Sequence, residues 1–243
     1  MNRVLAHTGA RYPILQAPMG WIARTELASA VSRAGGLGII ETSSGETEAC
    51  QAEINKMKAL NLPFGVNLPI RFLRDDAMLK FVCNSGVKFV TTSAGSPAKF
   101  IAPLKAAGIT VYHAVPTVET ALKCVEAGVD GLVVEGAEGG GFKNPEEVST
   151  LVLNKKSTPC IRALKSERTR AIHDEGLMAP DALKGIRDVY FHGDMEAAPA
   201  LAGQSAGLID EVKSAQQIIE QTVAQFFAIA GRLGGLAAAK AFG

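Results

Sequence analysis

The sequence lacks several features that would assign a protein to a class at once. Its 25 Lys and Arg residues nearly balance 24 Asp and Glu residues, and a net charge of +1 gives no electrostatic reason to expect a nucleic-acid partner. No run approaches the ~20 apolar residues that a membrane-spanning helix needs, because Arg232 and Lys240 interrupt the apolar C-terminal stretch. The N-terminal residues show no apolar signal-peptide core. We therefore expect a cytoplasmic protein that binds neither nucleic acid nor membrane.

Cysteine motifs and a dinucleotide fingerprint are also missing. The four cysteines are far apart in the sequence and form no CxxC pair or metal-ligand spacing, so we expect free thiols in a reducing compartment and no metal site. No GxGxxG motif follows a predicted strand, so a nicotinamide could bind only transiently, without a Rossmann site.

The most informative stretch that is present runs over residues 133–149. An apolar β-branched run ends at Glu135, three glycines follow at Gly139–Gly141, and Asn144-Pro145 with two acidic residues resembles a helix N-terminus. Glycines without Cβ atoms let a backbone lie against a flat ligand, and α/β proteins place binding sites where a strand, a loop and a helix N-terminus meet. A tight turn that merely requires glycine explains this stretch equally well when it is considered alone.

The chain up to residue 153 alternates between apolar runs and helical patterns. Four helix ends are followed by glycine and then directly by an apolar run, which is typical of the helix-to-strand junctions of a parallel sheet. The recurrence predicts an α/β fold, a (β/α) TIM-barrel-type domain over residues 1–153 with six βα units. The predicted strands are 12–19, 37–44, 64–70, 87–95, 110–116 and 129–136.

After residue 153 the alternation stops. We expect residues 154–243 to form a small C-terminal helical region without buried strands, ending in a long helix. Its loop 199–212 carries Gly203, Gln204 and Gly207, and we expect it to fold back over the barrel mouth.

Polar and glycine residues gather at the ends of the predicted strands, which is the functional face of a (β/α) barrel. They are Gln16, Met19, Gly20, Ser43, Ser44, Asn67, Thr92, Ser93, His113 and residues 135–142.

The chain resembles the nitronate monooxygenase family, once called 2-nitropropane dioxygenases, which also includes flavin-dependent enoyl-ACP reductases. The resemblance rests on PILQAPMGW, RAGGLGII, PFGVNLP, VEGAEGGGFKNPEEVSTLVL, PCIRALKSERTR and AGQSAGLID, in that order. It implies an FMN-dependent enzyme that oxidises small alkyl nitronates with O2. An NAD(P)H-dependent enoyl-ACP or quinone reductase is the nearest alternative, and a phosphate-binding barrel without flavin is a weaker one.

The resemblance also implies which residues hold FMN. Pro18, Met19 and Gly20 would pass along the isoalloxazine ring, Asn67 would contact it, and Gln204 would reach in from the helical region. Three more residues, Glu135, Gly139 and Gly140, would line the ring. Structural explanations compete: Asn67 could be a hydrogen-bonded amide at a strand end, Gln204 a surface residue and Met19 part of the core.

Position 142 departs from the family pattern. Members with a catalytic histidine carry it after the glycine pair, where this chain has Phe142, which cannot accept a proton. Phe142 and Lys143 would then contact the substrate, although an exposed lysine is the simpler interpretation of Lys143. His113 is a weak candidate for the missing base, because a histidine at a strand end is more often structural.

The number of strands is the second departure. A closed barrel of this type has eight βα units of roughly 30 residues, and this chain lacks about two of them, because Leu153 runs directly into Asn154. By the resemblance, the missing part carries the phosphate-binding loops. The second hypothesis, from a different class, is therefore a truncated non-catalytic scaffold that has lost the FMN phosphate site, and open sheet edges would favour a homo-oligomer.

Overall fold

The computed structural model describes residues 2–73, 75–136, 139–143, 151–153, 156 and 160–241. The chain divides into two compact units, which we describe separately. The first unit comprises residues 1–95, 102–111 and 213–243, and the second comprises residues 96–101 and 112–212.

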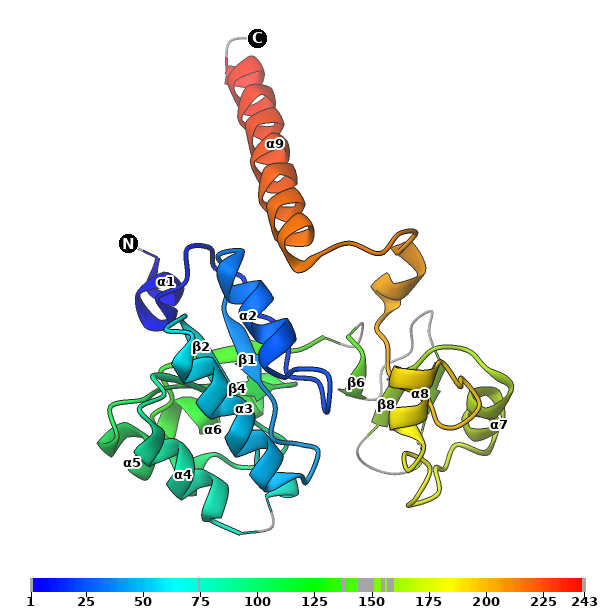
Figure 1. The fold of residues 1–243 in the computed structure, drawn as a ribbon. Helices are drawn as coiled ribbons and strands as arrows, with labels where there is room; N and C mark the ends of the chain where they lie inside the picture. Colours follow the sequence, from blue (N-terminus) through cyan, green and yellow to red (C-terminus); the bar gives the residue numbers. More distant parts are fainter. Residues whose placement is uncertain are drawn as a thin grey trace. The chain divides into compact units, whose positions relative to one another are not determined.

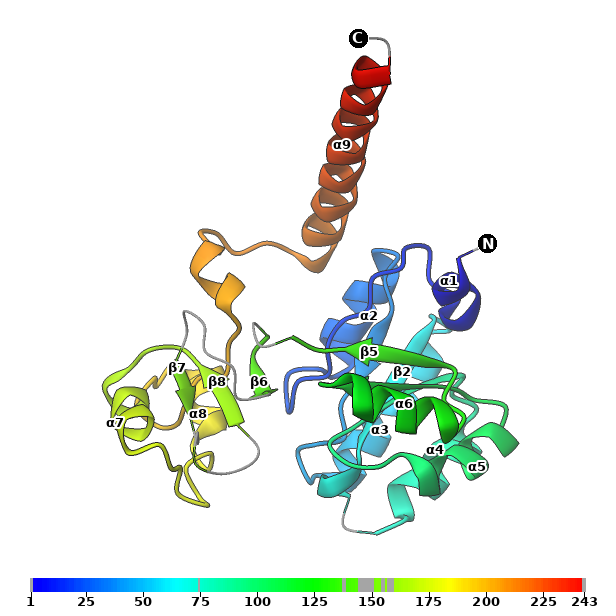
Figure 2. The same cartoon turned by 180° about the vertical axis from the view of Figure 1, so that it is seen from behind.

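The main sheet has five strands in the order β1-β2-β3-β4-β5 (Figures 1 and 2). They are β1 (Gly38–Ile40), β2 (Phe64–Pro69), β3 (Phe89–Ser93), β4 (Thr110–Val115) and β5 (Gly131–Val134). The pairs β1–β2, β2–β3 and β4–β5 are parallel. Five of the six predicted strands are thus confirmed, and the sixth, 12–19, contributes one parallel bridge from Leu15 to Leu37.

The helices from α2 onward follow the predicted alternation, and α1 precedes the first predicted strand. They are α1 (Arg3–Thr8), α2 (Thr25–Arg33), α3 (Thr47–Ala59), α4 (Ala77–Ser85), α5 (Ala98–Ala106) and α6 (Val118–Glu126), with a short 3-10 helix η1 (Ile70–Phe72). At the four predicted helix-to-strand junctions the glycines have left-handed φ angles of 99°, 82°, 70° and 92°, at Gly35, Gly86, Gly108 and Gly128. This conformation favours glycine, which is why the same residue recurs there.

The first unit builds its core where helices cover the sheet. Ile39, Ile40, Val66 and Leu68 are buried in the strands, and Ile54 of α3 is completely buried against them. Because both faces of a parallel sheet are covered, its strands are near-continuous apolar runs. Helix α2 packs so tightly on β1 that a Cβ atom on Gly38 would lie 2.1 Å from the carbonyl oxygen of Ala28.

A second, antiparallel sheet of three strands lies in the second unit. It consists of β6 (Gly141–Lys143), β7 (Leu151–Leu153) and β8 (Cys160–Ala163), in the order β6-β8-β7. The expectation that no buried strand follows residue 153 was wrong, because all four residues of β8 are buried. The predicted boundary at 153/154 falls between β7 and β8, which pair with each other.

Strand β8 is difficult to predict from the sequence because its apolar run is short and contains Arg162. Leu153, Ile161 and Ala163 nevertheless form a buried cluster, with Ile172 and Leu183 packed against it. A strand that pairs on both edges can thus be specified by tertiary contacts that local patterns do not reveal. The predicted helix start at 144–147 lies outside the described residues.

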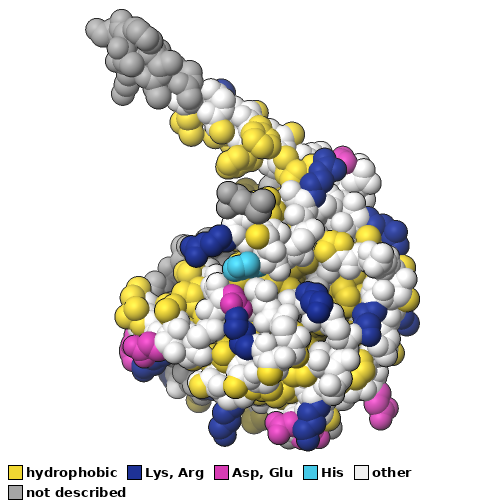
Figure 3. Space-filling model, turned by 90° about the vertical axis from the view of Figure 1, so that its left-hand side faces the viewer, with side chains coloured by type: hydrophobic (Ala, Val, Ile, Leu, Met, Phe, Trp, Pro, Cys, Tyr) yellow, Lys and Arg dark blue, Asp and Glu magenta, His cyan; other side chains and the backbone are white. Residues whose placement is uncertain are grey.

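The remaining elements are α7 (Glu167–Glu175), α8 (Ile186–His192), the 3-10 helix η2 (Gln204–Leu208) and the predicted terminal helix α9 (Ala215–Ala241). Hydrophobic side chains are exposed along α9, including Phe226, Phe227 and Leu233 (Figure 3). Among the residues that the structure describes, no helix combines the length and the apolar character needed to cross a membrane.

Candidate functional site

The carboxyl ends of the parallel strands carry a chain of polar side chains in the first unit. The Thr42 hydroxyl, just after β1, donates a hydrogen bond to the carbonyl oxygen of Asn67 in β2 (2.7 Å). The Asn67 amide in turn donates to the carbonyl oxygen of Thr91 (3.2 Å), to its hydroxyl (3.1 Å) and to the hydroxyl of Ser93 (3.4 Å), both in β3. Three neighbouring strands are therefore joined through side chains where a (β/α) barrel binds ligands.

Asn67 is held firmly by these contacts. Its side chain is buried, with only 3% of the residue exposed, and both residues that receive its amide hydrogens belong to the neighbouring strand. The structural explanation for Asn67, a hydrogen-bonded amide at a strand end, therefore accounts for its donor group. Its contact with a flavin ring stays a prediction.

The loop that follows the first predicted strand forms a tight turn. The carbonyl oxygen of Met19 accepts hydrogen bonds from the backbone N–H groups of Ile22 (3.1 Å) and Ala23 (2.8 Å). Trp21 has a φ angle of 62°, which is uncommon for a residue with a bulky side chain. Pro18 and Met19 are exposed on this turn, so Met19 is not a core residue. The turn therefore carries Pro18, Met19 and Gly20 together, and their contact with a flavin ring stays a prediction.

Gln16 lies just before this turn, and its side chain extends the sheet. Its amide accepts the N–H of Ile39 and donates to the carbonyl oxygen of the same residue, both at 3.2 Å. Gln16 thus extends, through its side chain, the short backbone pairing that its own N–H makes with Leu37, which assigns it a structural role.

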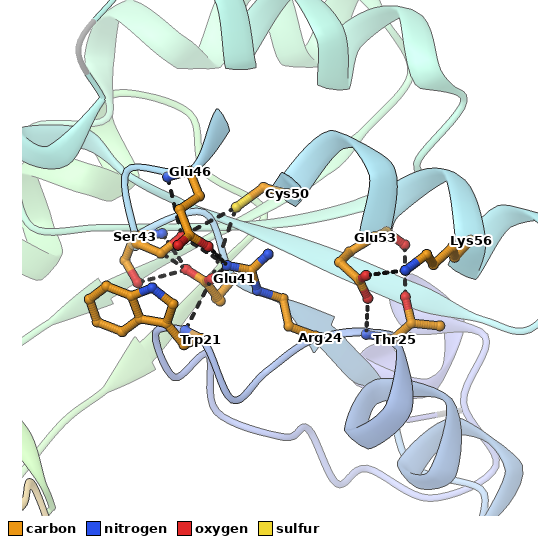
Figure 4. Close-up of polar contacts among 10 residues, drawn as sticks. Trp21, Arg24, Thr25, Glu41, Ser43, Glu46, Cys50, Glu53 and Lys56 are labelled. Carbon is orange, nitrogen blue, oxygen red and sulfur yellow. Dashed lines mark hydrogen bonds and ion pairs between the residues drawn. The ribbon is translucent and has the colours of Figure 1, made fainter. Parts of the chain in front are cut away.

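A buried ionic cluster behind the turn was not predicted from the sequence (Figure 4). Glu41, the residue after β1, is completely buried and forms a 2.8 Å ion pair with Arg24, which also reaches Glu46 at 3.0 Å. Cys50 of α3 lies at the edge of the cluster, with its sulfur 3.9 Å from Glu41. Burial raises the pKa of the Cys50 thiol, so a structural thiol is expected there.

The other predicted residues lie in the second unit. Glu135 is exposed just after β5, and its backbone N–H donates to the carbonyl oxygen of Val115 (3.1 Å). Gly139 and Gly140 follow, and a Cβ atom on Gly140 would lie 2.8 Å from the backbone of Ala202 and Gly203. The glycine loop therefore touches the segment that leads into Gln204, so the structure brings Gly140 and the Gln204 segment together.

This second segment is fixed to β8. The N–H of Leu164 donates to the carbonyl oxygen of Ala200 (2.9 Å), and the N–H of Ala202 donates to that of Arg162 (3.3 Å). Arg162 is completely buried, and no sequence pattern singled it out. The backbone that leads into Gln204 and the residues directly after Gly140 are thus both anchored by pairing with β8 or its neighbouring residue Leu164.

The candidate substrate residues Phe142 and Lys143 belong to β6, opposite Ile161 and Cys160 of β8. Strand β6 was not among the predicted strands, because it depends on antiparallel pairing with the distant β8. The structure describes only the backbone of these two residues.

The role of His113, the weak candidate for the missing base, stays a prediction. His113 lies within β4 and is 4% exposed, and burial lowers its pKa by disfavouring the charged form. It is therefore a neutral, buried side chain at pH 7. In the part of the chain that the structure describes, no three His, Cys, Asp or Glu residues are grouped so that they could hold a metal ion.

Comparison with known proteins places these elements in one family. A family model described as Nitronate monooxygenase matches residues 2–78 and 71–157, more than half of the chain. A probable nitronate monooxygenase of Staphylococcus haemolyticus is 26% identical over 261 aligned positions, covering 91% of this chain and 71% of the relative.

Other relatives share only part of their length. The (3aS,4S,5R,7aS)-5-hydroxy-7a-methyl-1-oxo-octahydro-1H-indene-4-carboxyl-CoA dehydrogenase of Mycobacterium tuberculosis is 32% identical over 145 residues. This match covers 59% of the present chain and 41% of the relative, so the chain matches about two fifths of that protein. Among solved structures, FabK from Thermotoga maritima superimposes with a TM-score of 0.89 at 26% identity, covering 96% of this chain and 98% of that one.

Proposed function

Because the chain belongs to the nitronate monooxygenase family, we propose that it is an FMN-dependent oxidoreductase that oxidises alkyl nitronates with O2. The family match carries the proposal, since the matched residues 2–157 include the 18–20 turn, Asn67 and the glycine loop. When bound, FMN would supply the electron-accepting chemistry, while the protein would supply binding, orientation and exclusion of water.

The residues of the first turn suit a flat ring. Pro18 and Met19 are exposed, and Gly20 leaves no side chain between the backbone and a ligand. The indole Nε1 of Trp21 is buried and has no hydrogen-bond partner among the described residues, so the turn carries a polar donor that this part of the protein does not satisfy. These features support a binding site for a planar, acceptor-rich group such as an isoalloxazine.

In this proposal Pro18, Met19 and Gly20 pass their backbone along the ring and Asn67 contacts its edge. In the second unit Glu135, Gly139 and Gly140 line the ring, and Gln204 reaches it from the 199–212 loop. The close approach of Gly140 to Ala202 and Gly203 supports a shared role for these two segments.

The phenylalanine at position 142 determines whether we expect the neutral nitroalkane or its anion as the substrate. A neutral nitroalkane must lose the proton next to its nitro group before oxidation, and a phenylalanine cannot accept it. An alkyl nitronate has already lost this proton. We therefore propose the nitronate anion as the substrate, with Phe142 and Lys143 as substrate contacts, where the lysine charge would attract the anion.

The test uses the purified full chain loaded with FMN and desalted. Retained flavin absorbance at one FMN per chain, and O2 consumption with propyl nitronate but not with neutral nitropropane at the same pH, would support the proposal. Loss of all flavin on desalting would overturn it. Equal rates with both substrate forms would overturn the argument from Phe142 while leaving the flavin assignment in place.

A reductase is the second candidate. Hydride transfer from a nicotinamide to a flavin needs no general base, so Phe142 does not oppose an NAD(P)H-dependent enoyl-ACP or quinone reductase. Bleaching of the flavin by NADPH without O2 would favour this candidate. The name of the Mycobacterium tuberculosis relative adds acyl-CoA compounds to the substrates that this assay should include.

A non-catalytic scaffold is the alternative of another class, and a colourless protein that rejects FMN would favour it. A homo-oligomer and a cytoplasmic location remain parts of the proposal. The oligomer is supported by exposed apolar residues at β5, the last strand in the order of the main sheet: Val133 is 38% exposed and Val134 is 79% exposed. Sedimentation of the FMN-loaded chain over a range of concentrations tests it.

A further inference from the structure

Glu41 joins two loops with a single buried carboxylate. Its Oε1 atom accepts the backbone N–H of Trp21 (3.2 Å), and its Oε2 atom accepts the N–H groups of Ser43 (2.6 Å) and Ser44 (3.0 Å). The backbone N–H of Glu41 also donates to the carbonyl oxygen of Ala23 (3.0 Å). One residue therefore binds the 18–24 turn and the loop after β1 at the same time.

The second oxygen also holds the Ser43 hydroxyl in place beside Gly20. The Ser43 hydroxyl donates to Oε2 (3.0 Å), and this hydroxyl oxygen would lie 3.2 Å from a Cβ atom on Gly20. Glu41 thus contacts the turn directly at Trp21, and its partner Ser43 lies next to Gly20. The turn it holds contains the positive φ angle of Trp21, a conformation that surrounding contacts must maintain.

Arg24 completes the cluster. Its Nη2 atom lies 2.8 Å from Glu41, and the same atom donates to the Ser44 hydroxyl and to Glu46, both at 3.0 Å. A buried carboxylate is costly unless it is paired and hydrogen-bonded, and Glu41 meets both conditions. Its side chain is completely buried and already accepts hydrogen bonds at both oxygens, so it is not available to take a proton from a substrate.

A buried ion pair is weak evidence for stability, because packed apolar residues often serve as well. A fixed backbone conformation is something that apolar residues would not provide here, since they cannot accept the N–H groups of Trp21, Ser43 and Ser44. The cluster is therefore better suited to holding one loop geometry than to adding stability.

We propose that Glu41, with Arg24, is a positioning residue that fixes the Pro18–Trp21 turn in the shape that receives the flavin ring. This inference rests on the proposed function for the identity of the ligand. The shape of the turn itself can be measured without any ligand.

The test is Glu41→Gln, which keeps the size of the side chain but places an NH2 group where Oε1 or Oε2 accepts N–H groups. Trp21 is the only tryptophan in the chain, so its fluorescence reports on this turn alone. In the flavin-free protein we expect a shifted emission and stronger quenching by acrylamide. In the FMN-loaded series we expect the Kd for FMN to rise at least about tenfold, equivalent to about 1.4 kcal/mol.

Glu53→Gln is the matched control. Glu53 also accepts a backbone N–H group, that of Thr25 (2.8 Å), and pairs with a cation, Lys56 (2.6 Å), but it holds the start of α2. These residues form a separate group in Figure 4. We expect Glu53→Gln to leave both Trp21 fluorescence and the Kd for FMN unchanged, even if it lowers the unfolding midpoint.

A second variant covers the case in which Glu41→Gln does not fold. Arg24→Lys keeps the charge, but an ammonium group on a shorter reach cannot keep the contacts of Nη2 with Glu41, Ser44 and Glu46 together. It should shift Trp21 fluorescence in the same direction.

Unchanged Trp21 fluorescence in whichever of the two variants folds would overturn the proposal. So would altered fluorescence with an unchanged Kd for FMN. If the unmodified chain binds no flavin, the proposed function fails, and altered fluorescence in the variant would still show that Glu41 sets the shape of the turn while removing its link to a flavin.

Discussion

Replacing Gly140 by alanine tests the contact between the glycine loop and the segment that leads into Gln204. The added Cβ atom would lie 2.8 Å from the carbonyl carbon of Ala202 and 2.8 Å from the backbone nitrogen of Gly203. Both neighbours are backbone atoms, and the hydrogen bond from Ala202 to Arg162 holds them in place. No side chain can rotate away, so one of the two segments must move.

The cost follows from overpacking. Inserting a methyl group into a well-packed site typically costs about 1–3 kcal/mol. If the two segments separate to relieve the contact, the penalty appears as easier local opening around residues 199–206. If FMN requires both segments in place, as proposed, the same cost raises its Kd by about 5- to 150-fold.

Hydrogen exchange measured by mass spectrometry on peptides that cover 139–143 and 199–206 is the direct assay. Gly207→Ala is the control, because the site around Gly207 is open, with no atom within 4 Å of the added Cβ, and lies in the same loop. We expect Gly140→Ala to exchange faster than the unmodified chain at both segments, and we expect Gly207→Ala to exchange at the same rate as the unmodified chain. Equal exchange in Gly140→Ala and the unmodified chain would refute the close approach, whatever happens to flavin binding.

Three further predictions concern the fold. Gly38→Ala should lower the free energy of unfolding by more than about 2 kcal/mol in urea titrations, because its Cβ would lie 2.1 Å from the Ala28 carbonyl oxygen; an unchanged midpoint would contradict the packing of α2 on β1. Burial lowers the pKa of His113 in the folded state, so the free energy of unfolding should fall as the pH drops below about 6.5. In thermal scans, His113→Gln should make the melting temperature depend less on pH. Maleimide should label Cys83 first, because Cys83 is half-buried and the other three cysteines are buried. The labelling should be slow, because burial raises the pKa of the Cys83 thiol, and Cys83→Ser should remove this first phase.

The main sheet was predictable because its signals are local. A glycine at a helix end and an apolar run directly after it are read from adjacent residues, and the left-handed conformations of Gly35, Gly86, Gly108 and Gly128 show that the pattern has a backbone cause. Strand β8 was missed for the opposite reason. Its four residues contain an arginine, and their burial depends on two partner strands and on residues as distant as Leu201.

In the candidate site, too, features with local sequence signals were predictable and features that depend on distant residues were not. Glycine and proline reveal the 18–20 turn because backbone geometry constrains those residues, whereas Glu41 acquires its role from partners about 20 residues away, Trp21 and Arg24. One signal was present: an acidic residue directly after the buried run LGII, followed by three hydroxyl residues. A carboxylate at the end of a buried strand must find several donors or stay unburied, and the loops on either side of it supply them. An acidic residue in this position is therefore better explained by a role in fixing two loops than by a role in catalysis. The Trp21 fluorescence experiment tests this role in fixing the loops.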